Sequence, residues 1–218
     1  MVSINISIMD SFEQLNSRAA AEWNAHLTGR GIFCVNVLGA PGAGKTASIV
    51  RIAEKLNANV FVIEGDAASD IDTKALNEKG IPAVQINTGG GCRLDISEIK
   101  AAFGENNFSG GFLFVENIGN LICPAAFSVG EHARLLVSSV TEGDDKPYKY
   151  PAAFEKSEII LLNKCDLLPF VDFDSEYYIK GVRHLNEKAT VYTVSGKNAT
   201  GYGGVARWIT DRAKELTK

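Results

Sequence analysis

The sequence predicts an α/β fold, with helices on both faces of a mostly parallel sheet of about seven strands. After the first 30 residues, short apolar runs alternate with helical stretches for the rest of the chain. Several of these runs are apolar throughout, as in strands that are buried on both faces. The length of 218 residues suits one domain. We therefore expect a single domain over residues 1–218, with a helical segment at 1–30 and the sheet-containing core at 31–218.

The first predicted element is an amphipathic helix over residues 7–29. Its apolar residues recur at spacings of three and four, at Ile8, Phe12, Leu15, Ala19, Trp23 and Leu27. Gly29 and Gly31 are expected to end it. The apolar stripe favours packing on the sheet, and contact with a partner protein is the alternative.

The core is predicted from the remaining apolar and helical runs. The expected strands are residues 32–38, 60–63, 83–86, 111–115, 134–140, 158–162 and 190–194. The expected helices are residues 45–56, 71–79, 95–103, 174–185 and 203–216. Residues 117–133 are expected to be irregular, and connections of that length are uncommon and often functional.

Charge and cysteine usage exclude several classes of protein. Lys and Arg number 22 against 26 Asp and Glu, a net charge of −4 that does not favour nucleic-acid binding. No apolar run approaches the roughly 18 residues of a membrane span, and the first residues do not resemble a leader peptide. The four cysteines form no C-x-x-C pair, which argues against a zinc finger and suits reduced thiols. We expect a cytoplasmic protein that binds neither nucleic acid nor membrane.

A phosphate-binding loop follows the first predicted strand. The string G-A-P-G-A-G-K-T at residues 39–46 matches G-x-x-x-x-G-K-[ST] between a strand and a helix. Backbone N–H groups and the helix N-terminus would cradle phosphates, Lys45 would reach the β- and γ-phosphates, and Thr46 would ligate Mg²⁺. The expected residues of this loop are Gly39, Pro41, Gly42, Ala43, Gly44, Lys45 and Thr46. The fold is therefore expected to be the three-layer sandwich of P-loop NTPases.

A second motif indicates which base is bound. Asn163, Lys164 and Asp166 form an N-K-x-D string after the predicted strand 158–162, similar to the guanine-specificity motif of GTPases. Its carboxylate would accept hydrogen bonds from the N1–H and N2–H₂ groups of guanine, an edge that adenine does not present. The string Ser195, Gly196, Lys197 follows the last strand, as the S-A-K-like loop of GTPases does. GTP is the expected ligand.

Two carboxylates are candidates for hydrolysis and magnesium binding. Asp66 follows the predicted strand 60–63, and Glu116 begins an E-N-I-G string that resembles the D-x-x-G motif of GTPases. We expect catalysis to involve Lys45, Asp66 and Glu116, and magnesium to be held by Thr46, Asp66 and Glu116. The alternative is that each carboxylate caps a turn. The sequence assigns no arginine finger, so slow hydrolysis of GTP to GDP and phosphate is expected.

With these motifs, the chain resembles the GTPases that incorporate nickel into hydrogenases, the HypB family. The strings that carry the resemblance are V-I-E-G-D at 62–66, Q-I-N-T-G at 85–89, E-N-I-G-N-L-I-C-P-A-A-F at 116–127 and T-E-G-D-D-K-P-Y-K-Y-P at 141–151. The resemblance implies a GTPase that forms a homodimer with GTP bound and helps deliver nickel. Its expected partners are a hydrogenase large-subunit precursor and other maturation proteins.

The resemblance also implies a metal site beside the nucleotide. The family ligands are the cysteine and histidine of G-x-G-C-H-L-D and the cysteine of N-L-x-C-P-A; here Cys92 and Cys123 are present, and Arg93 replaces the histidine. Arginine cannot ligate a metal, and it would lower the pKa of Cys92. Two thiolates from each of two protomers would suit Zn²⁺ or Ni²⁺. His132 is the one histidine that could complete this set of metal ligands. The alternative to a metal site is that both cysteines only pack in tight loops.

Two other functions remain open at this point. A urease-accessory GTPase shares the fold, but its C-P-H motif reads Cys123, Pro124, Ala125 here. The chain would otherwise be a GTP-controlled switch or a chaperone for another metalloenzyme, with little metal delivery of its own.

Overall fold

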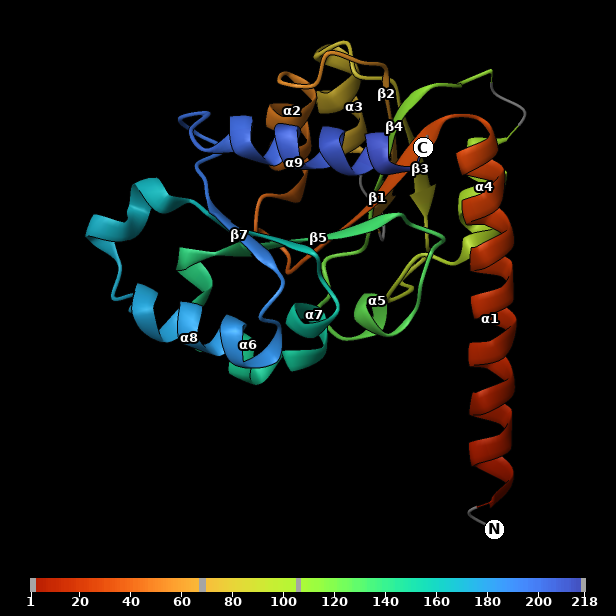
Figure 1. The fold of residues 1–218 in the computed structure, drawn as a ribbon, viewed down its shortest axis with the longest axis horizontal. Helices are drawn as coiled ribbons and strands as arrows, with labels where there is room; N and C mark the ends of the chain where they lie inside the picture. Colours follow the sequence, from red (N-terminus) through yellow and green to blue (C-terminus); the bar gives the residue numbers. More distant parts are fainter. Residues whose placement is uncertain (1–2, 67–69, 105–106, 217–218) are drawn as a thin grey trace.

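A seven-stranded parallel sheet forms the centre of the molecule (Figure 1). The computed structural model describes residues 3–66, 70–104 and 107–216, with side chains from residue 14 onward. The strands are β1 (Ile32–Gly39), β2 (Val60–Asp66), β3 (Ala83–Asn87), β4 (Gly111–Glu116), β5 (Ala133–Ser139), β6 (Ile159–Asn163) and β7 (Thr190–Thr193). Their order is β3-β2-β4-β1-β5-β6-β7, and every pairing between neighbours is parallel. The predicted fold class and all seven predicted strands are confirmed.

Helices cover both faces of this sheet, as expected. The six long helices that were predicted are α1 (Ser3–Gly29), α2 (Lys45–Ala53), α3 (Ile71–Glu78), α4 (Ile96–Phe103), α8 (Ser175–Leu185) and α9 (Tyr202–Glu215). Figure 1 shows α2, α3 and α9 on one side of the sheet, with α1, α4 and α8 on the other. This is the three-layer arrangement that the alternation of strands and helices predicts.

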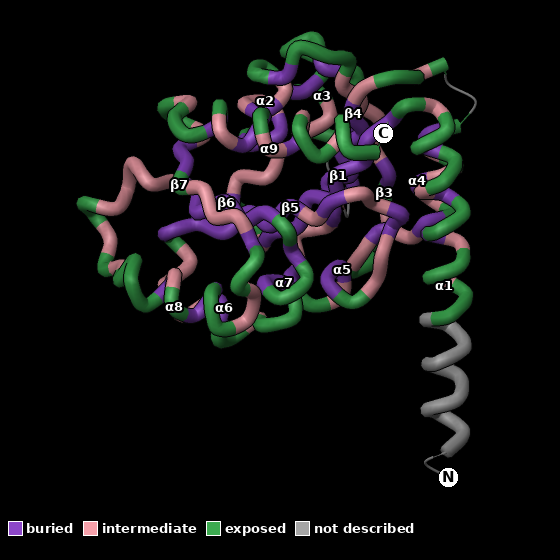
Figure 2. Tube along the Cα trace, viewed as in Figure 1, coloured by how far each residue is buried: buried purple, intermediate pink, exposed green. Residues whose placement is uncertain are grey.

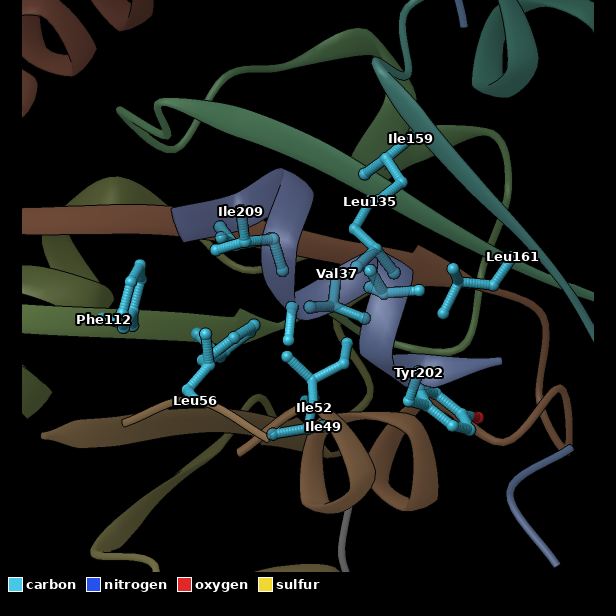
Figure 3. Close-up of a cluster of buried hydrophobic side chains, with 14 of the residues drawn as sticks. Val37, Ile49, Ile52, Leu56, Phe112, Leu135, Ile159, Leu161, Tyr202 and Ile209 are labelled. Atoms are coloured by element: carbon cyan, nitrogen blue, oxygen red, sulfur yellow. The ribbon is translucent and has the colours of Figure 1, made fainter. Parts of the chain in front are cut away.

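The core is divided between the two faces because successive side chains of β1 point in opposite directions. Val35 and Val37 pack with residues of α2 and α9 in one cluster. Figure 3 shows part of this cluster, with Ile52 of α2 and Ile209 of α9 near Val37. Cys34 belongs to the opposite cluster, with α1 and α4. Cys34 is therefore a packing residue of the core.

Several short helices fall where no helix was predicted. They are α5 (Cys123–Ala126), α6 (Lys146–Lys149), α7 (Pro151–Glu155), and the 3-10 helices η1 (Val140–Glu142) and η2 (Cys165–Phe170). Proline occupies the first turn of α5, α6 and α7, where its missing N–H costs nothing. The expectation that residues 117–133 are wholly irregular is wrong, because α5 begins there at Cys123.

The opening helix packs along only part of its length. Trp23 and Leu27 are buried in the cluster shared with α4. Leu15 belongs to the predicted apolar stripe but is 65% exposed, so that part of the prediction is wrong. In Figure 2, residues 14–19 of α1 are coloured exposed or intermediate, and the first buried residue of this helix among those described is Ala20. Ile8 and Phe12 lie outside the residues whose side chains are described.

Parallel strands bring the functional motifs to one edge of the sheet. The last residues of β1, β2, β4 and β6, together with the loops that follow β1, β6 and β7, carry the phosphate-binding string, the two candidate carboxylates and the two guanine motifs. Ligands of open α/β sheets bind at this carboxyl edge. No helix among residues 3–66, 70–104 and 107–216 is both long and apolar enough to span a membrane.

Candidate functional site

The phosphate-binding string forms the turn between β1 and α2. Gly44 is the residue before α2 and has a φ of +95°, a backbone conformation that suits glycine. A Cβ atom at Gly44 would lie 2.5 Å from Nδ2 of Asn163, so the loop also touches the predicted base site. The free N–H groups at the start of α2 can bind phosphate oxygens.

Glu116 connects this loop to the end of β4. The Thr46 hydroxyl donates to Oε1 of Glu116 at 2.8 Å, while Oε2 is buried without a hydrogen-bond partner. Burial raises the pKa of Glu116 to about 7, against the lowering effects of Lys45 and of the Thr46 hydrogen bond. A buried carboxylate oxygen without a partner costs free energy, which a bound cation or a bound water would relieve.

Three further acidic residues gather beside Glu116. Glu64 of β2 pairs directly with Glu116 of β4, and it accepts a hydrogen bond from the Thr73 hydroxyl at 3.0 Å. Burial raises the pKa of Glu64 to about 7. Oxygen atoms of Glu64, Asp66 and Asp72 lie within 4.8 Å of one another. This set of oxygen donors fits a hard divalent cation such as Mg²⁺.

Sequence reasoning placed Asp66 in this cluster and missed two of its neighbours. Glu64 lies in the same V-I-E-G-D string, two residues before Asp66 and therefore on the same face of β2. That spacing was a usable signal for Glu64. Asp72 lies on α3 and is brought to the cluster only by the fold.

Asn163 and Asp166 are held in place around the predicted base site. Asn163 donates to the Ala43 carbonyl at 2.9 Å, and its Oδ1 accepts from the backbone N–H of Gly196 at 3.1 Å. The Ser195 hydroxyl donates to Oδ1 of Asp166 at 2.6 Å. The N-K-x-D and S-G-K strings therefore meet at the phosphate-binding loop, as their positions predict.

Two residues that support the predicted base site were missed by sequence reasoning. The Tyr202 hydroxyl lies 3.1 Å from the Ser48 hydroxyl and donates to Oδ1 of Asn163 at 3.5 Å. Arg51 of α2 donates from Nε to the Gly196 carbonyl at 2.9 Å. Neither residue belongs to a local motif, so no sequence signal pointed to them.

Cys92, on the loop that follows β3, lies beside Cys123, the first residue of α5. Their thiols form a hydrogen bond, and the side-chain amide of Asn120 donates to the Cys92 carbonyl at 3.1 Å. Cys92 is exposed and Cys123 is partly exposed. Two accessible sulfur donors fit a borderline or soft cation such as Zn²⁺ or Ni²⁺, with further ligands needed to complete its coordination.

Arg93 occupies the position of the family histidine and has other partners. Its guanidinium carbon lies 3.9 Å from the centre of the Phe127 ring, and its Nη1 lies 3.9 Å from Oδ2 of Asp95. The hydrogen bond with Cys123 raises the pKa of the Cys92 thiol, and the opposing effect of Arg93 is smaller. The expectation that Arg93 gives Cys92 a lowered pKa is therefore wrong for the protein without metal.

His132 is not placed to complete the thiol pair. Its Nδ1 accepts from the backbone N–H of Cys34 at 2.8 Å, and its Nε2 lies 2.9 Å from the Thr28 hydroxyl. Both ring nitrogens are therefore occupied in the contact between α1 and the sheet. Burial lowers the pKa of His132, which keeps the ring neutral and suits Nδ1 as an acceptor.

Comparison with known proteins places these features in a family. Residues 33–193 match the family model described as CobW/HypB/UreG, nucleotide-binding domain. The chain is 44% identical over 197 residues to hydrogenase maturation factor HypB from Azotobacter chroococcum, covering 89% of this chain and 65% of that protein. It is 37% identical over 212 residues to HypB from Escherichia coli K12, covering 96% of this chain and 72% of that protein. The chain thus spans about two thirds of these relatives.

A solved structure shares the whole arrangement. The crystal structure of HypB from Helicobacter pylori in complex with nickel is similar to this chain with a TM-score of 0.87 and 29% sequence identity. The match covers 92% of this chain and 95% of that one. The two chains therefore share the fold over most of their length.

Proposed function

The chain belongs to the CobW/HypB/UreG family, and from this membership we propose that it is a slow GTPase that delivers nickel during hydrogenase maturation. The observation that carries the proposal is a single stretch of chain, residues 116–123. It begins with Glu116 beside Thr46 and ends with Cys123 beside Cys92. One segment thus joins a residue of the nucleotide site to a residue of the metal site.

The proposed hydrolysis uses groups of the phosphate-binding loop and carboxylates at the ends of β2 and β4. Lys45 binds the β- and γ-phosphates, and the helix N-terminus and loop N–H groups bind the remaining oxygens. Thr46, Asp66 and Glu116 would hold Mg²⁺, which would neutralise charge on the phosphates. The buried Oε2 of Glu116 is the group available to orient the attacking water or the metal. Guanine is selected by Asn163, Lys164 and Asp166, with the loop of Ser195, Gly196 and Lys197 closing over the base.

The proposed cargo site is formed by Cys92 and Cys123. Two sulfur donors from one protomer leave a tetrahedral metal half coordinated, so a second copy of the chain supplies the other two. We propose that GTP binding favours this homodimer and that nickel, or zinc in its place, is held between the copies. The proposed recipients of the metal are a hydrogenase large-subunit precursor and other maturation proteins.

A turnover and metal-binding experiment tests this function. We expect wild-type protein to release phosphate from GTP slowly, and Lys45→Ala to abolish that release. We expect Ni²⁺ or Zn²⁺ to bind with an affinity that falls at least tenfold in Cys123→Ala. Cys34→Ala is the matched control, because that thiol is buried in the core. Metal affinity that is unchanged in Cys123→Ala would contradict the metal site.

Arg93 supports a second candidate, a GTP-controlled chaperone for another metalloenzyme with little metal delivery of its own. In this function GTP would control dimerisation and partner docking, and the thiols would carry no cargo. The Arg93→His variant separates the two functions because it restores the family ligand set. If only Arg93→His binds nickel or zinc, the second candidate is correct. If wild type also binds metal, nickel delivery is supported.

A further inference from the structure

Arg93, which directly follows Cys92, lies against a residue of the segment that carries Cys123. Its guanidinium carbon is 3.9 Å from the centre of the Phe127 ring. Among the described residues this is the shortest distance between a cation and an aromatic ring, since the next shortest is 4.7 Å. The flat, weakly hydrated guanidinium of arginine stacks well on an aromatic face. The contact therefore joins the loop of Cys92 to the segment of Cys123.

The backbone of Phe127 is held in turn by a second arginine, Arg134 of β5. Arg134 donates to the Phe127 carbonyl at 3.3 Å and to the Ala125 carbonyl at 3.0 Å. Its side chain also forms an ion pair with Glu131, and both of these side chains are largely buried. The ring on which Arg93 stacks is therefore attached to the sheet. The same bonds hold α5, which begins at Cys123 and ends directly before Phe127.

Cys92 lies between a run of glycines and a fixed segment. Residues 89–91 are three glycines, the residue type that restricts the backbone least. On the other side of Arg93, Leu94 is buried in the core. Cys92 itself is exposed, and the side-chain amide of Asn120 holds its carbonyl. The position of Cys92 thus depends on few contacts, and the side chain of Arg93 supplies one of them.

We propose that Arg93 is a positioning residue, whose stacking on Phe127 holds the Cys92 thiol beside the Cys123 thiol. The inference rests on the proposed function, because the pair is taken as a preformed half of a site for a divalent cation that binds sulfur. Arginine donates no ligand atom. Its contribution is to reduce the freedom that Cys92 loses when the metal binds. Arg93 therefore orders the thiols at the position where the family string has a metal ligand.

The effective concentration of one thiol at the other measures this positioning without metal. Two protein thiols and one glutathione disulfide give one protein disulfide and two molecules of reduced glutathione, so the exchange is balanced. The full chain is brought to equilibrium in glutathione buffers that contain a metal chelator. Differential alkylation and peptide mapping then give the fraction of protein with a disulfide between Cys92 and Cys123. That fraction and the glutathione ratio yield the effective concentration.

Variants of the stacked pair test whether the contact sets this value. Phe127→Leu removes the ring and leaves Arg93 and both cysteines in place, while Arg93→Ala removes the guanidinium. We expect each variant to lower the effective concentration about fivefold, as for a partly exposed cation–ring contact. The double variant should also lose about fivefold, because both changes break the same contact. Phe127→Tyr keeps the ring face and should stay within about twofold of wild type.

The same variants are then titrated with Zn²⁺ alone. A metal shared by two copies takes two thiols from each, so the lost contact counts twice. We expect the Zn²⁺ Kd to rise more than fivefold in Phe127→Leu and to keep the wild-type value in Phe127→Tyr. Arg212→Ala is the matched control, because Arg212 lies 5.8 Å from the Trp208 ring within α9. It should leave the effective concentration and the Zn²⁺ Kd unchanged.

The two measurements separate failure of the inference from failure of the proposed function. If Phe127→Leu and Arg93→Ala keep the wild-type effective concentration, or if their losses multiply in the double variant, the contact does not position Cys92. The inference is then wrong, and the proposed function stands. If the effective concentration falls as expected but the wild type does not bind Zn²⁺, the proposed function fails. The inference fails with it, because the ordered thiols then hold no metal.

Discussion

Asp166 is the single residue best placed to test base selection. Its Oδ1 is held by the Ser195 hydroxyl, so the carboxylate is already oriented before a base arrives. We expect Asp166→Asn to weaken GTP binding by on the order of 100-fold, because the amide N–H₂ faces the guanine amino group. The same variant should bind xanthosine triphosphate more tightly than wild type does, because xanthine has a carbonyl at that position.

Equilibrium binding of both nucleotides to the variant checks this prediction. Ser195→Ala is the control, since it removes the hydroxyl that orients Asp166 without altering the carboxylate. It should weaken GTP binding by less than about tenfold and leave the preference for guanine. Equal losses for both nucleotides in Asp166→Asn would show that this residue does not read the base.

Glu116 should make the stability of the ligand-free protein depend on pH. Its pKa is raised to about 7 in the folded protein, so the folded state holds a proton that the unfolded state releases near its usual value of 4.5. The free energy of unfolding should therefore fall as the pH rises from about 4.5 to about 7. The contribution of this one group is up to about 3 kcal/mol.

Glu116→Gln isolates that contribution. Glutamine keeps an acceptor for the Thr46 hydroxyl and has no proton to lose in this range. In urea unfolding at a series of pH values without metal, the variant should lose less stability between pH 5 and pH 8 than wild type does. Parallel pH profiles for the two proteins would contradict the raised pKa.

Residues that act through local motifs were predictable, and those that act through the fold were not. Lys45, Asn163 and Asp166 became candidates because the chemistry predicted for them requires a fixed local spacing. Asn120 and Tyr202 have no such spacing, since their partners come from distant segments. The pKa of Cys92 was predicted with the wrong sign because its neighbour Arg93 was visible in the sequence, while contact with the Cys123 thiol was not.

At the scale of elements, α1 contains both residues that stabilise the fold and residues that do not. Leu27 is fully buried against the sheet, while Leu15 on the same helix is 65% exposed. We expect Leu27→Ala to lower the free energy of unfolding by about 2–5 kcal/mol. Leu15→Ala should change it by less than about 0.5 kcal/mol. Urea denaturation of both variants measures the difference, and equal losses would mean that the whole helix docks on the body.

Long elements were predicted better than short ones for a physical reason. The strands and the six long helices have enough residues for an apolar period to be visible. A helix of one turn, such as α5 or α6, has no intrinsic stability and forms because the chain around it is already held. The turn at Cys123 was therefore invisible in the sequence, although the cysteine itself was recognised.

At the scale of the whole molecule, the strand order explains why the two candidate sites adjoin. β1, which leads into the phosphate-binding loop, pairs with β4, which leads into the loop of Cys123. β2 lies between β4 and β3, so the carboxylates at its end lie between the phosphate loop and the loop of Cys92. The motifs alone predicted which segments carry function, and the topology determines that they form one continuous surface.

The proposed homodimer should depend on Ile122, which is 66% exposed directly before Cys123. Two copies that share a metal through Cys92 and Cys123 must bring this residue into the interface, where a carboxylate would lose its hydration. We therefore expect Ile122→Glu to raise the dimer Kd at least tenfold with Zn²⁺ and a non-hydrolysable GTP analogue bound. Leu15→Glu adds the same charge at an equally exposed leucine on α1 and should leave the dimer intact. Sedimentation velocity measures both, and a dimer lost only in Leu15→Glu would place the interface on the opening helix instead of at the cysteines.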